Sequence, residues 1–272
     1  MTNLPATHAH LRLPEFPKVL EPRREWLEAN VRPAWLLRAV ESQSIQEGDS
    51  FLGGNAPYLP EGEAWPTCPH CTREMGFVMQ VNLAPFVGVL KFVQPGTFQF
   101  WNCWYCLPSG DAYADARQLR THSKSYRADF ISYGSSSHLA RWYVGKALSL
   151  GTAHGAEQNY SGPILLSPEP YLSLPHPFDD GLDGWDSEEI DVYWEVSDQY
   201  WNRETISQVG GYPSWMQDGT TPRDPTTGEP TAFALALGTG DTGVIWGDTG
   251  FYYFFASNNG DLSEPFVLEQ TT

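Results

Sequence analysis

Basic residues are scarce in this sequence, which has 16 Lys and Arg against 33 Asp and Glu, a net charge of -17 over 272 residues. Nucleic-acid binding draws most of its affinity from Lys and Arg, so this balance argues against DNA or RNA as a partner. No segment approaches the roughly 18 apolar residues that a membrane span needs. The first twenty residues lack the basic start and apolar core of a secretory signal. We therefore expect a soluble, cytoplasmic protein that binds neither nucleic acid nor a membrane.

The negative charge is confined to the second half of the chain. Residues 1–146 hold 14 basic and 13 acidic residues, whereas residues 147–272 hold 2 and 20. Nine acids fall within twenty positions of this half: Asp179, Asp180, Asp183, Asp186, Glu188, Glu189, Asp191, Glu195 and Asp198. A charge run is usually a solvated face that keeps a protein soluble. The alternative is a docking surface for a basic protein.

Aromatic residues are interleaved with these acids. Such a mixture can bind Arg-rich segments through stacking, cation–π contacts and ion pairs, although ordinary use of the aromatics in a core is equally open. The candidate partner-binding residues are Trp185, Asp186, Glu188, Glu189, Asp191, Trp194 and Trp201.

Helical patterns are few and lie mainly near the N-terminus. Pro22 opens a helical stretch over residues 21–30, and Pro33 restarts one up to about residue 42. Weaker helical spacing covers residues 136–148, and one turn fits 111–118. From Ser50 onward, short apolar runs separated by Gly and Pro predict strands at 76–81, 88–94, 97–101, 126–132, 232–237, 243–246 and 250–257. The predicted fold is mostly β (α+β).

The chain also repeats itself. Ser50 begins the run S-F-L-G-G-N-A-P, and Ser207 begins the similar run S-Q-V-G-G-Y-P. In each copy a strand follows about 24 residues after the first Gly, and a second Gly-led strand follows that one, at 88–93 and at 250–255. Paired glycines supply the positive φ of a tight turn and let backbones approach closely. We predict two copies of one β unit.

Only four cysteines are present, and all lie in two C-x2-C pairs, Cys68 with Cys71 and Cys103 with Cys106. A C-x2-C turn directs two thiolates at one ion, so two such turns complete a closed tetrahedral zinc site with no open position for catalytic water. The 31 residues between the pairs fit two strands that bring the turns side by side. We predict a structural zinc site. Thiol redox chemistry is the competing interpretation, because C-P-H-C is also the sequence of an oxidising disulfide exchanger, and simple disulfides are a third.

Four segments follow from these patterns. They are an N-terminal arm and helical segment (1–44), a first β unit with the C-x2-C pairs (45–107), an intervening acidic insertion (108–203) and a second β unit (204–272).

These motifs resemble a known family. The G-G-x2-P run after Ser50, Trp65-Pro66, the first cysteine pair and the strand from Phe77 are similar to the bacterial YwqG-like family of unknown function, and the second copy resembles its C-terminal half. The order of motifs is also similar to the eukaryotic programmed-cell-death-protein-two family, whose members act as dedicated chaperones for a ribosomal protein. The resemblance implies a mostly β, internally duplicated fold and a protein-binding role, and it supplies no catalytic residues.

The sequence thus favours a non-enzymatic binding module with structural zinc, whose acidic, aromatic-rich surface binds a basic protein as a chaperone, adaptor or antitoxin. The alternative is an enzyme of unknown substrate, either a hydrolase or a C-x2-C thiol oxidoreductase. A purely structural or assembly role is a third hypothesis.

Overall fold

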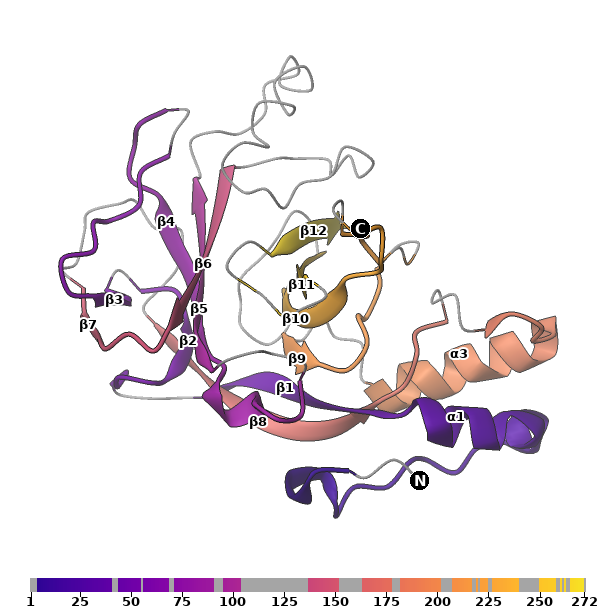
Figure 1. Cartoon of the computed structure of the whole chain (residues 1–272). Helices are drawn as coiled ribbons and strands as arrows, with labels where there is room; N and C mark the ends of the chain where they lie inside the picture. Colours follow the sequence, from indigo (N-terminus) through magenta and orange to yellow (C-terminus); the bar gives the residue numbers. More distant parts are fainter. Residues whose placement is uncertain are drawn as a thin grey trace.

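The computed structural model describes most of the chain (Figure 1). The described residues are 4–40, 44–54, 56–68, 71–90, 95–103, 137–151, 163–177, 182–201, 207–216, 219, 221–224, 227–239, 250–257, 260, 262 and 265–271. The sequence predictions at 111–118, 126–132 and 243–246 lie outside these residues.

Strands dominate, as the sequence predicts. The strands are β1 (Arg32–Val40), β2 (Ser50–Leu52), β3 (Tyr58–Pro60), β4 (Gly76–Asn82), β5 (Gly96–Cys103), β6 (Ser137–Val144), β7 (Leu148–Leu150), β8 (Ile164–Ser173), β9 (Gln208–Gly210), β10 (Ala232–Gly238), β11 (Gly250–Ala256) and β12 (Phe266–Thr271). The helices are the short 3₁₀ turns η1 (Ala6–His8), η2 (Lys18–Arg23) and η3 (Ala84–Phe86), with α1 (Arg24–Asn30) and α3 (Ser187–Trp201). The mostly β fold class is confirmed.

Within the described residues, ten strands form one antiparallel sheet in the order β12-β11-β10-β9-β1-β8-β2-β4-β5-β6. Strands β3 and β7 form a separate two-stranded sheet. The long pair β1 and β8 lies at the centre, where Leu36 is opposite Glu169. The N-terminal segment and the acidic segment therefore each contribute a central strand.

The helix predicted from residue 33 to about 42 is wrong, because these residues form the central strand β1. Trp35, Leu36 and Ala39 have helical spacing, but Ala34, Trp35 and Leu37 are all buried. A strand covered on both faces reads as a continuous apolar run, which periodicity alone cannot separate from a helix. Pairing with β8 and β9 on its two sides determines the outcome.

The sheet curls into a half-barrel, so that its two halves face each other (Figure 1). Ring centroids of Phe98 on β5 and Phe254 on β11 lie 5.1 Å apart, and those of Phe100 and Tyr252 lie 5.2 Å apart. These strands are far apart in the sheet order, so the contacts exist only because the sheet bends. The concave face is therefore filled by one aromatic and aliphatic core.

Three further cores cover the outside of the sheet. One packs Trp65 and Trp101 with the cysteines against the first half. A second packs Trp215 against Tyr253 and Phe255 on the other half. A third joins η2, α1 and α3 to the end of β8.

The predicted duplication is visible in the sheet. Outward from the central β1–β8 pair, the strand order is β9, β10, β11, β12 on one side and β2, β4, β5, β6 on the other. Both copies of the repeated serine make the same bond: Ser50 Oγ accepts from Asn82 N at 3.0 Å, and Ser207 Oγ accepts from Gly238 N at 3.1 Å. Each glycine pair has positive φ, with Gly54 at 80° and Gly211 at 76°.

The details of the repeat differ from the sequence prediction at two places. The counterpart of β11 is β5, not residues 88–93, since Gly88 and Val89 form a turn after η3. Residues 136–148, predicted as a helix, contain strand β6 instead, which pairs along its whole length with β5. In the second case long-range pairing with β5 overrides the local pattern. Residues 91–94 of the strand predicted at 88–94 lie outside the described residues.

Candidate functional site

The first cysteine pair lies on a tight loop, the knuckle, that leads into β4. Three backbone hydrogen bonds close it: Cys68 N to Arg73 O at 2.7 Å, Thr72 N to Cys68 O at 2.8 Å, and Met75 N to Pro66 O at 2.9 Å. Thr72 has a φ of 60°, in the left-handed region that residues other than Gly seldom occupy. The Trp65 indole N–H also donates to Met75 O at 2.9 Å, which anchors the loop to the core.

Cys103, the last residue of β5, brings a third thiol to the knuckle. Antiparallel pairing places Gly76 at the start of β4 opposite Asn102, so the end of β5 meets the loop that precedes β4. The Sγ atoms of Cys68, Cys71 and Cys103 all lie within 4.8 Å of one another, and Cys71 Sγ is 3.5 Å from Cys103 Sγ. Cys68 and Cys103 are buried, whereas Cys71 is partly exposed.

This donor set fits a soft metal ion. Thiolates at a Zn–S distance of about 2.3 Å around a tetrahedral ion lie about 3.8 Å apart, whereas the sulfurs of a disulfide lie about 2.05 Å apart. The 3.5 Å between Cys71 and Cys103 is close to the first value. Within the described part of the chain, this is the one cluster of three such ligands. These three residues, Cys68, Cys71 and Cys103, are called the Cys triad. The triad could therefore hold a metal ion, with its thiolates as the ligands.

Part of the predicted zinc site lies outside the described residues. Cys106, the expected fourth ligand, is there, and so are Pro69 and His70 within the first pair. The four-cysteine set and the identity of the ion thus stay predictions.

The second half carries a knuckle of the same shape without cysteines. Three equivalent backbone bonds close it: Asp224 N to Glu229 O at 2.9 Å, Gly228 N to Asp224 O at 2.7 Å, and Thr231 N to Pro222 O at 2.8 Å. Gly228, with a φ of 74°, takes the place of Thr72. Asp224 and Thr227 stand where the first knuckle has Cys68 and Cys71. The repeat thus extends to a loop that motif comparison alone did not align.

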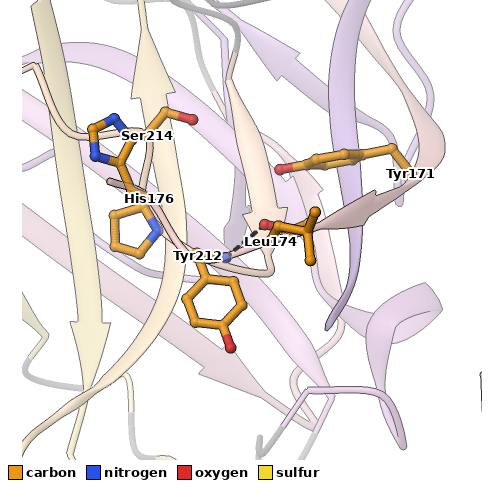
Figure 2. Close-up of a pocket in the computed structure, with 7 residues that line it drawn as sticks. Tyr171, Leu174, His176, Tyr212 and Ser214 are labelled. Carbon is orange, nitrogen blue, oxygen red and sulfur yellow. Dashed lines mark hydrogen bonds between the residues drawn. The ribbon is translucent and has the colours of Figure 1, made fainter. Parts of the chain in front are cut away.

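A small pocket lies beside the second glycine pair, between the end of β8 and the segment after β9 (Figure 2). Its lining residues are Tyr171, Ser173, Leu174, His176, Tyr212, Pro213 and Ser214. Ser173 Oγ accepts from Tyr212 N at 2.9 Å, which fastens the Gly-Gly-Tyr-Pro turn to β8. The space holds about one water molecule, so the pocket is a packing feature of the turn.

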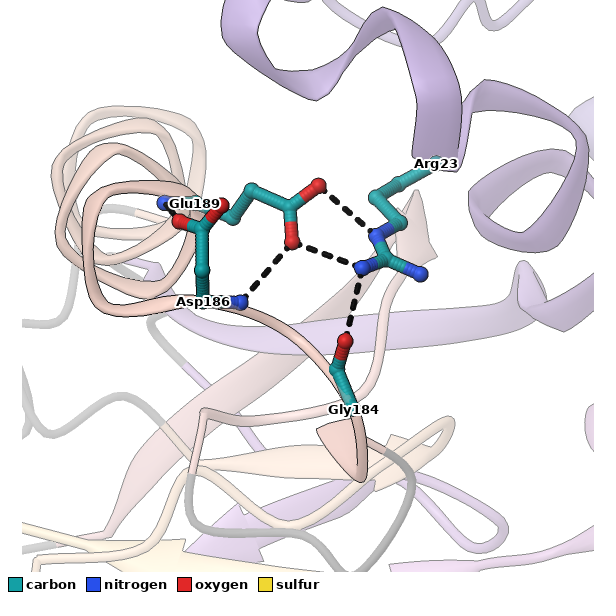
Figure 3. Close-up of polar contacts among 4 residues, drawn as sticks. All are labelled: Arg23, Gly184, Asp186 and Glu189. Atoms are coloured by element: carbon teal, nitrogen blue, oxygen red, sulfur yellow. Dashed lines mark hydrogen bonds and ion pairs between the residues drawn. The ribbon is translucent and has the colours of Figure 1, made fainter.

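The acidic tract runs into helix α3, and two of its acidic residues hydrogen-bond to each other at the start of the helix (Figure 3). Glu189 N donates to Asp186 Oδ1 at 2.8 Å, and Asp186 N donates to Glu189 Oε2 at 2.9 Å. This reciprocal pair is a capping box. Arg23 of η2 also binds the Glu189 carboxylate, with Nε and Nη2 at 2.9 and 2.7 Å. These hydrogen bonds, first that from Arg23, lower the pKa of Glu189.

Glu189 therefore differs from its acidic neighbours. It is only 7% exposed and is bound by Arg23. Glu188, Asp191 and Glu195 instead recur on the exposed face of α3, and Asp186 is exposed at its start. We call Asp186, Glu188, Asp191 and Glu195 the acidic stripe. Among the described residues, Glu188, Asp191 and Glu195 make no ion pair.

The predicted tryptophans divide in the same way. Trp185 is half-buried, packs edge-on against Trp26 at 5.4 Å, and has the Arg23 guanidinium 5.3 Å from its ring centroid. Trp194 is half-buried and packs edge-on against the buried His176, also at 5.4 Å. Trp201 ends α3, and its side chain lies outside what the structure describes. The partner-binding role of these three tryptophans and of the acidic residues stays a prediction.

One buried carboxyl group gave no signal in the sequence. Glu269 lies on the edge strand β12, opposite Tyr252 of β11. Burial raises the pKa of Glu269 to about 7, against a smaller opposing effect of its hydrogen bond with Tyr252. Its Oε2 atom is buried and has no hydrogen-bond partner among the described residues. A single Glu in an edge strand has no motif, so only the fold reveals its surroundings.

No helix in the described ranges has the length and apolar character needed to cross a membrane. No curated protein matches the chain. Residues 50–264 match the family DUF1963, described as a domain of unknown function. The match covers more than half of the chain, from β2 to the segment just before β12, and so includes both knuckles and the acidic stripe. The chain therefore belongs to the DUF1963 family.

Proposed function

We propose that this protein is a non-enzymatic binding module that uses the acidic stripe and its neighbouring tryptophans to hold a basic protein. The observation that carries the proposal is the outward acidic face of α3, where Glu188, Asp191 and Glu195 have no basic partner among the described residues. Its setting is a half of the chain with 2 basic and 20 acidic residues. Such a field attracts and orients a positively charged partner.

The contacts beneath the stripe support this role, because they fix the helix that presents it. The capping box at Asp186 and the double hydrogen bond from Arg23 hold the first turn of α3. Tyr193, fully buried, donates from its hydroxyl to Pro175 O at 2.6 Å and fixes the opposite face. A surface that is ordered before binding loses less conformational entropy when a partner docks. Trp185 and Trp194 are partly exposed beside the stripe and add aromatic surface for Arg side chains.

The sequence resemblance points to the same class of function. Similarity to the YwqG-like family and to the programmed-cell-death-protein-two chaperones implies a protein-binding role. A chaperone, an adaptor and an antitoxin would all use one chemistry here, namely carboxylates and aromatic rings against Lys and Arg. The partner we propose is a basic protein of this kind.

We also propose that the Cys triad, with Cys106 as fourth ligand, holds a structural zinc ion. Three thiols at these separations match the donor set, and all three belong to the core that packs the first half. When bound, the ion would join the knuckle to the end of β5 and so connect two segments that are more than thirty residues apart in sequence.

The binding proposal is tested by affinity capture from host lysate, at low salt and at half-molar salt, with mass-spectrometric identification of bound proteins. We expect a stoichiometric basic protein at low salt and its release at high salt, since screening shortens the range of exposed charges from about 8 Å at physiological ionic strength. The decisive variant is Glu188→Lys/Asp191→Lys/Glu195→Lys. With exposed pairs worth roughly 0.5 kcal/mol each, it should weaken the complex about tenfold or more.

The matched control is Glu47→Lys/Glu61→Lys/Glu229→Lys, which changes the net charge equally at three exposed acids outside α3. It should bind almost as tightly as the unchanged protein. Equal losses in both variants would show that only the net charge matters, and full binding by the α3 variant would refute the stripe as the docking site.

A further inference from the structure

The two knuckles show which part of the cysteine site depends on thiols. Both loops are closed by the same three backbone hydrogen bonds, with donor–acceptor distances of 2.7 to 2.9 Å in each. Both are followed by a bulged strand pair, at Phe77 in the first half and at Phe233 in the second. The second loop reaches this shape with Asp224 and Thr227 in place of thiols. This backbone shape therefore forms without thiol ligands in the second half, where Thr227 N donates to Asp224 Oδ1 at 3.4 Å instead.

The three thiols differ in access. Cys68 and Cys103 are about 1% and 0% exposed, whereas Cys71 lies partly open to solvent on the turn itself. An oxidant from solution therefore reaches Cys71 first. The Cys103 thiol stands 3.5 Å from the Cys71 sulfur, so closing a disulfide requires the sulfurs to approach by roughly 1.5 Å, a movement within reach of side-chain rotation.

We propose that the Cys triad is a reversible oxidation site, at which a peroxide converts Cys71 and Cys103 to a disulfide and any bound metal ion is released while the fold persists. Cys71 attacks the peroxide, so its sulfur gains an oxygen as a sulfenic acid and one water leaves. The Cys103 sulfur then displaces that oxygen, the S–S bond forms, and a second water leaves. The two sulfurs together lose two electrons to the peroxide, and their two thiol hydrogens end in water. A dithiol reductant reverses the step by thiol–disulfide exchange.

The inference rests on the proposed metal site only for the release of the ion. Disulfide formation and metal release are therefore measured separately, and the metal content is determined before oxidation. A sample that holds no metal but forms the disulfide would contradict the zinc proposal and leave the oxidation site intact.

The experiment uses the full chain carrying Cys106→Ser, so that the three described cysteines are the only thiols. The protein is treated with hydrogen peroxide, quenched, alkylated without reduction and digested for mass spectrometry. We expect a cross-linked peptide pair that joins Cys71 to Cys103 and is lighter than the two thiols by two hydrogens. In the unchanged chain, which keeps all four proposed zinc ligands, metal release followed with a colorimetric chelator should rise with the cross-link. The near-ultraviolet circular dichroism of the aromatic core should be retained in both proteins.

Two further variants complete the test. Cys103→Ser, in the same background, should lose the cross-link, and Cys68→Ser should keep it, because Cys68 is not part of the disulfide. Wild-type protein with Cys106 present checks that the pairing is the same. A predominant Cys68–Cys71 disulfide, oxidation of Cys71 with no cross-link, or loss of the near-ultraviolet signal together with the metal would each overturn the proposal.

Discussion

Replacement of Glu269 by Gln should change how the free energy of unfolding depends on pH, with a smaller effect on that free energy at acid pH. The carboxyl group has an ordinary pKa of 4.5, which burial on β12 raises to about 7 in the folded protein. Since the folded state holds the proton more tightly than the unfolded state, stability falls as pH rises from about 4.5 to 7. At roughly 1.4 kcal/mol for each pH unit, the full loss is about 3 kcal/mol.

Glu269→Gln keeps an oxygen that can accept from Tyr252 but has no proton to lose. We therefore expect the unfolding free energy of the variant, relative to wild type, to rise by roughly 2.5 kcal/mol between about pH 5 and pH 8. The assay is urea denaturation at constant ionic strength at several pH values in that window. Subtracting the two curves removes the titration of every other group. A difference that does not vary with pH would refute the assignment of a protonated, buried carboxyl at Glu269.

Three other perturbations follow from local contacts. Gly211→Ala should lower the free energy of unfolding by several kcal/mol, because a Cβ there would meet Ser173 Cβ at 2.6 Å and Ala34 Cβ at 2.8 Å. Gly62 has the same φ of 76° but lies in open space, so Gly62→Ala should lower it by only about 1 kcal/mol. Denaturant unfolding of the two variants measures both values. Asp186→Ala should lower the free energy of unfolding by about 1 kcal/mol through loss of the helix cap. Asp183→Ala, at an exposed neighbour, should lower it by less than about 0.5 kcal/mol, and equal effects would contradict the capping role. His8 is fully buried, its Nε2 is 2.9 Å from Ala34 O, and desolvation lowers its pKa from 6.5, so its contribution to stability is complete above that value and is lost as pH falls below it. Tryptic cleavage at Arg12, divided by the cleavage rate of an unstructured Arg peptide at the same pH, should therefore increase as the pH falls below that value. A ratio that does not change with pH would argue against the His8 anchor.

The duplicated β units could be predicted because the repeat preserves residues that the backbone needs. The glycine pairs at 53–54 and 210–211 all have positive φ, and Ser50 and Ser207 each accept a backbone hydrogen bond from the neighbouring strand. Such residues report local geometry directly. The first cysteine pair likewise marks the knuckle, because a C-x2-C spacing is typical of a tight turn that directs two thiols to one point.

The central strands and the helical tract could not be predicted in the same way. The sequence of β1 fits helical spacing, and only its position between β8 and β9 makes it a strand. The acidic tract gives no sequence signal for the contact that fixes the start of α3. Glu189 binds Arg23, which lies 166 positions earlier in the sequence. The raised pKa of Glu269 likewise depends on a pairing with β11 that forms only when the sheet is complete.

We propose above that the knuckle and the end of β5 join around one metal ion. Zinc K-edge X-ray absorption on protein purified without added metal or chelator, with the zinc content determined on the same sample, tests it most directly. We expect about one zinc per chain with a sulfur shell near 2.3 Å, which disappears in Cys68→Ser and Cys103→Ser. Protein kept reduced throughout purification that folds with no zinc, or with zinc in a shell of only nitrogen and oxygen, would contradict this proposal.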